Sequence, residues 1–282
     1  MIKTALNTHV FSLHGGEEKG SPLYLTVPSF DETGLVKHGF STRIGGISTD
    51  DLGPLNLSFT RGDVHHNVRV NYELFCKGLG IDYRDLVFSD QTHTANCMAV
   101  TKRHCGMGFS RKQTYSDIDA LMTNKRGVPL VTLFADCVPV LLLDIKTPAI
   151  SAVHAGWRGT VGEIAKIAVK NMTSEYGTDP KNILAAIMPS IGKCCFEVGG
   201  EVAEEFEKVF VDKLTPFVER VNNGKSYIDM QGINRVQLIN AGVLAENITV
   251  TDLCTKCNSD VFHSHRAAGD KRGSLAAIIE LV

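Results

Sequence analysis

Two histidines and one cysteine stand where buried strands are expected to end. Cys137 follows the apolar run 129–133, His154 follows the run 149–153, and His93 lies in a similar context. Side chains at strand ends of α/β proteins converge in crevices, because a rigid backbone aims them there. One thiolate and two imidazoles suit Zn²⁺, and three protein ligands leave a fourth position for water or substrate. The sequence therefore predicts an open metal site at His93, Cys137 and His154.

Each of these residues also has a plain structural interpretation. The two histidines could be polar residues that end strands, and a free cysteine often packs as a small buried hydrophobe. Asp136, next to Cys137 in the sequence, could act as a general acid or base or orient a ligand through a hydrogen bond. The same roles are open to Asp119, unless it simply ends a strand.

Two further segments have the composition of anion-binding loops. Arg43 lies in a segment rich in Gly, Ser and Thr at 38–48, where a guanidinium can hold an oxyanion through two hydrogen bonds. Arg158 and Thr160 stand at the expected start of a helix, whose free N–H groups and dipole attract anions. We predict that Arg43 and Arg158 bind substrate, although a surface ion pair would explain Arg158 equally well.

Asn56 is a further candidate for substrate binding. It lies in the segment 53–58 and could hydrogen-bond a sugar or a base, or serve the turn itself. No Walker A loop and no dinucleotide fingerprint occurs in the sequence.

The remaining cysteines include the adjacent pair 194–195 and a C-x-x-C motif at 254–257. A structural zinc site usually combines two C-x-x-C-like halves, and neighbouring side chains point apart in an extended chain. The sequence therefore argues against a second zinc site.

The elements that position these residues follow from hydrophobic periodicity. Short runs rich in Val, Ile, Leu and Phe predict strands, and several are apolar on both faces, which indicates covering layers on both sides. The predicted strands are 86–90, 97–101, 118–123, 129–134, 138–143, 149–154, 183–188 and 275–281. Helical patterns occur at 66–79, 160–176, 200–213 and 231–242. Because no linker or repeat divides the chain, we predict a single α/β domain over 1–282, with 1–30 as a weakly patterned N-terminal edge.

Composition narrows the class of function. The 282 residues are 43% hydrophobic and 21% charged, which is ordinary for a globular protein. A net charge of −2 provides no basic face for nucleic acid, and no apolar run approaches the length of a membrane span. Eight cysteines without a secretory leader pattern favour reduced thiols, so we expect a cytoplasmic protein.

Taken together, the motifs of this chain resemble those of the laccase-domain, or polyphenol oxidase, family. They occur in the order of that family over roughly residues 35–280, nearly the whole chain. The motifs are FSTRIGG at 40–46, QTH at 91–93, DAL at 119–121, ADCVP at 135–139, HAGWRG at 154–159, IGKCCFEVG at 191–199 and CT at 254–255.

The resemblance implies both a fold and an activity. It implies a layered α/β/β/α sandwich with mixed sheets, and a purine nucleoside phosphorylase with adenosine deaminase and S-methyl-5′-thioadenosine phosphorylase activity. The zinc ligands of the family fall on His93, Cys137 and His154. Thr94 stands where a glycine often follows the histidine, and Lys193 replaces a usual proline. Both differences affect loop shape, so they concern substrate preference more than metal binding.

The leading hypothesis is a zinc enzyme that uses phosphate, purine nucleosides and water, in which Arg43 binds phosphate, Asp136 shuttles a proton and Cys137 is a ligand. A four-copper oxidase would need several His-x-His motifs, and this chain has one, at 263–265, among 10 histidines. Cu²⁺ could still occupy the single site, which keeps a copper-dependent polyphenol oxidase as an alternative.

Two further alternatives need no catalytic metal. One is a Cys-His hydrolase or deamidase with Cys137 as the nucleophile and His154 as the base. The other is a non-catalytic sensor of metal or oxidation that uses exposed thiols. The sequence leaves the preferred purine, the physiological metal and the oligomeric state open.

Overall fold

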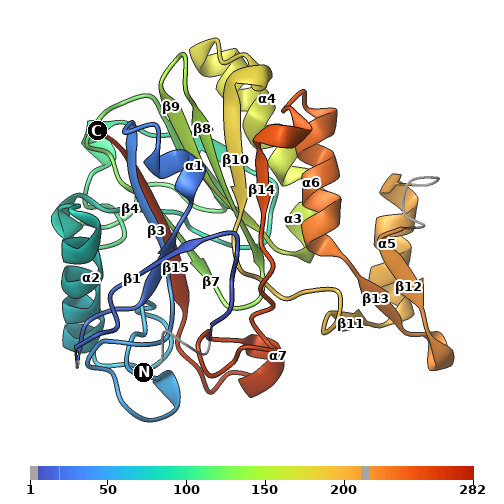
Figure 1. Ribbon diagram of the computed structural model, residues 1–282, viewed down its shortest axis with the longest axis horizontal. Coiled ribbons are helices and arrows are strands. Elements are labelled where there is room, and N and C mark those ends of the chain that lie inside the picture. The colour runs from blue at the N-terminus through green and yellow to red at the C-terminus, as the bar shows by residue number, and fades with distance from the viewer. Residues whose placement is uncertain (1–5, 19, 211–215) are drawn as a thin grey trace.

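Two six-stranded sheets pack face to face between helices in the computed structural model, which describes residues 6–18, 20–210 and 216–282 (Figure 1). The first sheet has the order β1-β2-β3-β15-β7-β4. Its strands are β1 (Ser12–His14), β2 (Tyr24–Thr26), β3 (Val36–Ser41), β4 (Val87–Phe88), β7 (Leu130–Phe134) and β15 (Leu275–Leu281). The last strand in the chain thus lies at the centre of this sheet.

The second sheet has the order β14-β10-β8-β9-β6-β5. Its strands are β5 (Cys97–Ala99), β6 (Ala120–Thr123), β8 (Val138–Asp144), β9 (Ala149–Ala155), β10 (Ile183–Ile187) and β14 (Ile248–Val250). Both large sheets are mixed, because each combines antiparallel pairs with parallel ones such as β4–β7 and β5–β6. Every residue of β8 and β9 is buried, as expected for strands that are apolar on both faces.

Some of the helices cover the outer faces of the two large sheets. The helices are α1 (Pro28–Asp31), α2 (His65–Leu79), α3 (Trp157–Val161), α4 (Ile164–Tyr176), α5 (Gly200–Phe210), α6 (Met230–Asn240) and α7 (His265–Ala268). Tyr72 and Phe75 of α2 pack on the first sheet, whereas Ala168 of α4 and Leu238 of α6 pack on the second. Between the sheets lies a third apolar cluster that includes Phe40. The layers are therefore α/β/β/α, and the predicted fold class is confirmed.

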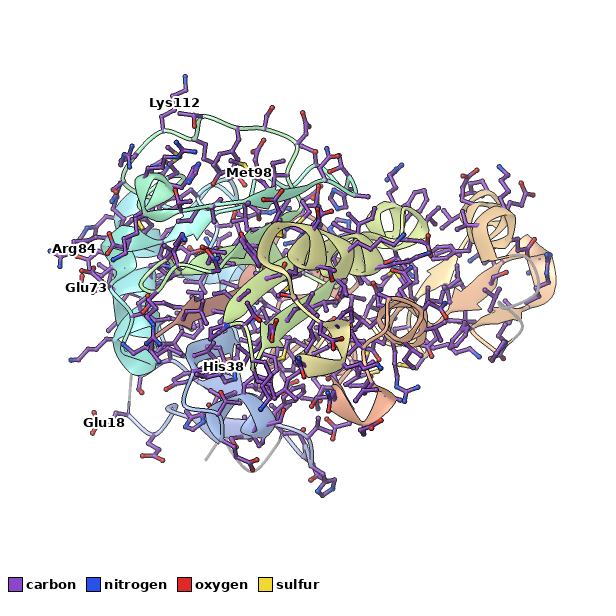
Figure 2. The ribbon with its side chains drawn as sticks, turned by 90° about the horizontal axis from the view of Figure 1, so that it is seen from above. Glu18, His38, Glu73, Arg84, Met98 and Lys112 are labelled. Atoms are coloured by element: carbon purple, nitrogen blue, oxygen red, sulfur yellow. The ribbon has the colours of Figure 1, made fainter. Side chains whose placement is uncertain are left out.

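A small third sheet extends to one side of the sandwich, with the order β11-β13-β12. Its strands are β11 (Glu197–Val198), β12 (Val218–Arg220) and β13 (Ser226–Ile228), and α5 lies against it. Figure 1 and the view from above in Figure 2 both show this lobe projecting beyond the main layers. Periodicity did not predict its strands, because two or three residues are too few to show an alternating pattern.

The eight predicted strands all occur, with ends that differ by a few residues. The predicted helix 160–176 is two helices, because Glu163 adopts a left-handed conformation with φ 57° between α3 and α4. The helix predicted at 200–213 is observed up to Phe210, and 211–213 lie outside the described residues. No helix in the described ranges has the length and apolar character needed to cross a membrane.

The segment 38–48, interpreted above as a loop, begins inside β3, and this is a correction. Gly39 permits α2 to pack closely on the strand, because a Cβ there would lie 2.6 Å from Leu79 Cδ2. Two polar side chains of β3 accept hydrogen bonds from other segments: His38 Nε2 accepts from Val27 N, and Ser41 Oγ accepts from Ala276 N. These hydrogen bonds allow a polar sequence to occupy a central strand.

Candidate functional site

Two of the three predicted metal ligands lie where the chain passes between the two large sheets, and the third lies near the end of a strand. His93 lies between β4 of the first sheet and β5 of the second, and Cys137 lies between β7 and β8, which also belong to different sheets. His154 is in β9, opposite Pro139 of β8. Two crossover loops and one strand end therefore meet at the same edge of the sandwich.

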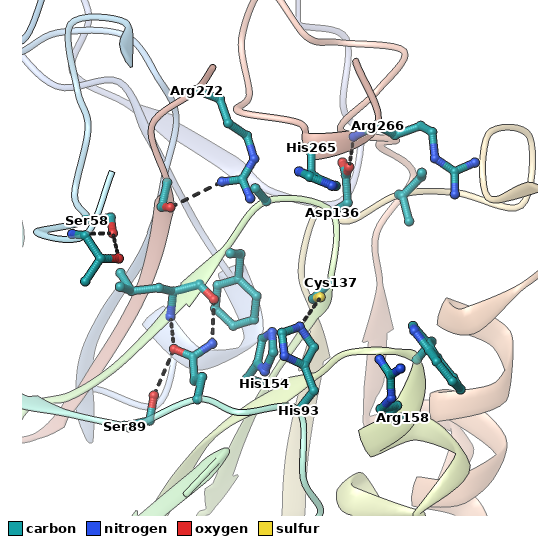
Figure 3. Close-up of a pocket in the computed structure, with 18 of the residues that line it drawn as sticks. Ser58, Ser89, His93, Asp136, Cys137, His154, Arg158, His265, Arg266 and Arg272 are labelled. Atoms are coloured by element: carbon teal, nitrogen blue, oxygen red, sulfur yellow. Dashed lines mark hydrogen bonds between the residues drawn. The ribbon is translucent and has the colours of Figure 1, made fainter. Parts of the chain in front are cut away.

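The structure brings the three donor groups together, as Figure 3 shows. One ligand atom from each of His93, Cys137 and His154 lies within 4.8 Å of the others. Cys137 Sγ is 3.9 Å from His93 Nε2, and the two imidazole rings have centroids 5.0 Å apart at an interplanar angle of 78°. A Cβ at Gly156 would lie 2.7 Å from His93 Cδ2, so this close approach requires a glycine there.

Asp119 organises both histidines from behind. One carboxylate oxygen accepts a hydrogen bond from His154 Nδ1 at 2.7 Å and another from the backbone N–H of His93 at 3.1 Å. The other oxygen accepts from the backbone N–H of Thr94 at 2.8 Å. Burial would raise the pKa of Asp119, but the hydrogen bonds from His154 and Thr94 outweigh it and hold that pKa below its usual value. The role of Asp119 is therefore to position the imidazoles.

Backbone strain is concentrated at this site. His93 and Asp136 both have positive φ, at 65° and 89°, a conformation that side chains with a Cβ adopt infrequently. Strained residues of this kind persist where the surrounding structure holds them, and they cluster at functional sites. At Asp136 the support is visible: Thr255 Oγ1 donates to one carboxylate oxygen and Arg266 N to the other, both at 2.6 Å.

The charges of Cys137 and His154 are linked. Burial would raise the pKa of Cys137, but the charge of His154 and hydrogen bonds from both imidazoles lower it to about 6. Burial would likewise lower the pKa of His154, but Cys137 and Asp119 raise it to about 9. Near pH 7 the metal-free pair is therefore a thiolate beside an imidazolium.

These residues fit a bound metal ion. The thiol is readily deprotonated, and His154 has one ring nitrogen committed to Asp119, which leaves Nε2 as its donor. One sulfur and two nitrogens from three chain segments leave room for a further ligand, and both Zn²⁺ and Cu²⁺ accept such a set.

A cavity of about 850 Å³ opens in front of the three ligands. Its walls combine aromatic rings with cationic side chains, which suits a ligand that has both a flat apolar part and an anionic part. The aromatic lining residues are Phe59, Phe88, Phe134, Trp157 and Phe196, and the arginines are Arg61, Arg158, Arg266 and Arg272.

Arg272 is the most buried of the cavity arginines that the sequence interpretation missed. The residue is 7% exposed, and its Nε is buried without a hydrogen-bond partner among the described residues. Nη1 donates to Gly273 O at 2.9 Å, which fixes the guanidinium at the cavity wall (Figure 3). Burial and the nearby charge of Arg61 lower the pKa of Arg272 to about 10, which still leaves it charged at neutral pH. Arg272 lies between Gly269 and Gly273, a glycine-containing context like the one that made Arg43 a candidate. This context is the sequence signal that could have identified Arg272.

The structure does not place Arg43 or Asn56 at the cavity. Arg43 is absent from the lining, and its Nη1 donates to Ser259 O at 2.8 Å. Asn56 is fully buried, donates to Ser58 O and Asp63, and accepts from the backbone N–H groups of Ser58 and Ser274. All four of its hydrogen-bonding positions are thus used within the protein. This geometry argues against the substrate roles predicted for both residues.

Arg158 and Asp136 do line the cavity. The Arg158 guanidinium lies 4.1 Å from the centroid of the Trp157 ring, and its side chain is exposed. The helix that begins at Trp157 has only five residues, so its dipole is weaker than the predicted long helix implied. An anion would therefore be held mainly by arginines.

The sulfur atoms of four other cysteines also lie close together, contrary to the interpretation above. Cys194, Cys195, Cys254 and Cys257 each offer a sulfur within 4.8 Å of the others. The side chains of the adjacent cysteines can point in the same direction, because 193–195 form a turn rather than the extended segment that was assumed.

The fold and site define a class: a layered α/β protein with a Cys/His₂ ligand set at the mouth of a cationic cavity. The chain belongs to the family described as multi-copper polyphenol oxidoreductase laccase, whose model matches residues 37–282. The resemblance inferred from the motifs is thereby confirmed.

The relatives include named enzymes. A purine nucleoside phosphorylase from Bacteroides thetaiotaomicron is 35% identical over 241 residues, which cover 85% of this chain and 89% of that protein. The adenosine deaminase RL5 from an unknown prokaryotic organism is 38% identical over 196 residues, 69% of this chain and 74% of its own. The crystal structure of the hypothetical protein YfiH from Bacillus licheniformis matches with a TM-score of 0.88 and 30% identity, covering 95% of this chain and 99% of that one.

Proposed function

We propose that this protein is an enzyme that cleaves purine nucleosides by phosphorolysis and also deaminates adenosine. Adenosine, inosine, guanosine and S-methyl-5′-thioadenosine are the proposed substrates of the phosphorolytic reaction. The observation that carries the proposal is a cavity that joins the Cys/His₂ set to a buried, positively charged Arg272. The similarity to a purine nucleoside phosphorylase and to an adenosine deaminase supports both reactions.

The phosphate is held by arginines in this proposal. Arg272 presents a buried guanidinium, and Arg61 lies near enough to lower its pKa. Phosphate accepts two hydrogen bonds from one guanidinium, which gives both affinity and orientation. Arg158, stacked on Trp157, is a third cation at the wall. With phosphate fixed, its oxygen attacks C1′ of the ribose while the bond from C1′ to the purine nitrogen breaks.

The aromatic lining residues accommodate the purine, since ring stacking favours flat heterocycles with little regard to their substituents. Asp136 lies at the same wall and is proposed to move the proton that the departing purine gains in phosphorolysis, or that ammonia gains in deamination. Its hydrogen bonds to Thr255 and Arg266 hold the carboxylate in place.

His93, Cys137 and His154 are proposed to hold one Zn²⁺ ion, with Cu²⁺ as the alternative occupant of the same ligands. When bound, such an ion supplies Lewis-acid polarisation and lowers the pKa of a bound water. A single Cys/His₂ set at one cavity offers a mononuclear site, which gives less support to a copper-dependent polyphenol oxidase than to nucleoside chemistry.

The test is an assay of the purified full chain with each nucleoside, with and without phosphate. We expect free purine base and the corresponding sugar 1-phosphate to form only when phosphate is present. The sugar product is ribose 1-phosphate, or 5-methylthioribose 1-phosphate from S-methyl-5′-thioadenosine. Inosine should form from adenosine with water alone. Loss of both activities in His93→Ala, with an unchanged melting temperature, would support the metal assignment. Turnover of phenolic substrates with no release of base in the copper-loaded enzyme would overturn the proposal in favour of the oxidase.

A second candidate is favoured by the charge state of the metal-free site. The thiol of Cys137 interacts with His154, and His154 is hydrogen-bonded to Asp119. This is the arrangement of nucleophile, base and orienting acid in Cys-His hydrolases. This hydrolase would work in chelator-treated protein and would form a covalent adduct on Cys137 Sγ. An adduct detected by mass spectrometry after incubation with substrate would favour it over the nucleoside enzyme.

A further inference from the structure

Four cysteines form a compact cluster away from the first three ligands. This four-cysteine cluster consists of Cys194 and Cys195 in the turn after β10 and Cys254 and Cys257 after β14. Cys194 Sγ lies 3.7 Å from Cys257 Sγ, and Cys195 Sγ lies 3.4 Å from the same atom. All four sulfurs lie within 4.8 Å of one another.

These distances match a tetrahedral metal site. Zinc–sulfur bonds are about 2.3 Å long, so two sulfurs at tetrahedral corners are about 3.8 Å apart. The separations of 3.4 and 3.7 Å lie close to that value, and the outer limit of 4.8 Å requires only small side-chain adjustments. A disulfide would instead join the sulfurs in pairs at about 2 Å and would not explain why all four converge.

We propose that the four-cysteine cluster binds one structural Zn²⁺ ion, independently of the proposed nucleoside chemistry. Four thiolates fill all the positions of a tetrahedral zinc ion, so this ion would have no open place for water or substrate. The chain would then hold two zinc ions with different tasks.

The backbone around the four-cysteine cluster is arranged to receive the ion. Gly192 N donates to Cys254 Sγ at 3.2 Å, and a backbone N–H directed at sulfur favours its anionic form. A Cβ at Gly192 would lie 3.3 Å from Cys194 Sγ and 3.3 Å from Cys254 Cβ, which is tight for any other residue. Thr255 N also donates to Ser190 O at 2.9 Å, which joins the two cysteine segments directly.

The four-cysteine cluster also adjoins the wall of the cavity. Phe196 and Glu197 follow the adjacent cysteines and line the cavity, and Thr255, inside the C-x-x-C motif, donates to Asp136. Arg266 Nη1 donates to Cys195 O at 3.1 Å and to Glu197 O at 2.8 Å. A bound ion would therefore fix the wall that carries these residues, without itself contacting a substrate.

The first test is metal analysis of the full chain purified under reducing conditions in zinc-containing medium. We expect two zinc ions per wild-type chain, and one in Cys257→Ser and in Cys194→Ser. His93→Ala should also retain one ion, and His93→Ala combined with Cys257→Ser should retain none. Cys105→Ser is the matched control, because Cys105 is a half-buried cysteine outside both ligand groups, and it should retain two.

The variants separate this proposal from the proposed function. If Cys257→Ser keeps as much zinc as Cys105→Ser while His93→Ala loses one ion, the four-cysteine site is overturned and the nucleoside site stands. If the reverse pattern appears, the four-cysteine site stands and the His93 site is overturned.

A second measurement needs no substitution of the four cysteines, so it does not depend on whether those variants fold. Apoprotein of the wild type and of His93→Ala is titrated with Co²⁺ under reducing conditions, because a tetrahedral tetrathiolate cobalt site has intense sulfur-to-cobalt charge-transfer absorption. We expect this absorption in both proteins, and its loss when excess Zn²⁺ is added. Absence of the tetrathiolate spectrum, or a mass that shows the four cysteines as two disulfides in freshly purified protein, would overturn the proposal.

Discussion

His154 Nδ1 and Asp119 Oδ1 are joined by a buried hydrogen bond of 2.7 Å, and this contact decides which imidazole nitrogen faces the cavity. Because the same carboxylate also accepts the backbone N–H of His93, one acidic side chain sets the positions of two proposed ligands. Partners of this kind raise the basicity of a ligand and fix its orientation.

Replacement of Asp119 should therefore weaken metal binding without removing a ligand. We expect Asp119→Asn to lower zinc affinity about 10- to 100-fold, the usual effect of losing such a partner. Competition with a chromophoric chelator measures the change. Asp117→Asn is the matched control, since Asp117 is an exposed carboxylate of the same loop region that accepts from Thr92 Oγ1, and its affinity should stay near wild type. If the two variants bind zinc with equal affinity, Asp119 does not contribute to metal binding.

The thiol of Cys137 should titrate well below an ordinary cysteine once metal is removed. With a pKa of about 6, its thiolate forms as the pH rises through 6, and alkylation should already be near its maximum rate at pH 7. Rates measured by mass spectrometry between pH 5 and 9 check this, with Cys105 as the internal reference because burial raises its pKa. In metal-loaded protein Cys137 should resist alkylation at every pH. Fast alkylation in the loaded protein would favour the Cys-His hydrolase.

Substitutions of Arg272 and Arg43, the two candidate phosphate-binding residues, should have different effects. Arg272→Lys keeps the charge but loses the paired hydrogen bonds of a guanidinium, each worth about 1.5–3 kcal/mol to a charged group. We expect the KM for phosphate to rise about 10- to 100-fold, while adenosine deamination, which uses water, changes less. Arg43→Lys should leave the KM for phosphate near wild type, because Arg43 lies outside the cavity lining. If the KM for phosphate rises in Arg43→Lys but not in Arg272→Lys, Arg43 is the phosphate-binding residue, as the sequence suggested.

Gly156 provides a steric test of the ligand arrangement. A methyl group there would lie 2.7 Å from His93 Cδ2 and 3.3 Å from Cys137 Sγ, so Gly156→Ala should displace the His93 ring. We expect loss of the metal ion held by His93, Cys137 and His154 and a decrease in stability of about 1–3 kcal/mol, as for other overpacked sites. Gly200→Ala, where the nearest contact would be an ordinary 3.4 Å, serves as the control in thermal melts and metal analysis. Full metal retention in Gly156→Ala would show that His93 is not a ligand in this geometry.

The sequence predicted those parts of the fold that long apolar runs specify. β8 and β9 were evident because they are apolar on both faces, and the candidate ligands Cys137 and His154 were found because they lie at the ends of such apolar runs. β3 was missed, because its polar residues find partners distant in the chain, such as Ala276 for Ser41. Arg272 and the four-cysteine cluster were missed for a related reason, since their surroundings depend on turns and tertiary contacts that local pattern does not encode.

The central position of β15 has a consequence for the order in which the protein can be completed. β15 pairs with β3 on one side and with β7 on the other, so the first sheet consists of two halves until this strand arrives. During synthesis residues 275–281 emerge after the strands with which they pair, so β3 and β7 each have one unpaired backbone edge until then. A truncated chain without this strand would expose two strand edges at the middle of the molecule. The strand that joins the two halves of the first sheet is thus synthesised after the strands that it joins.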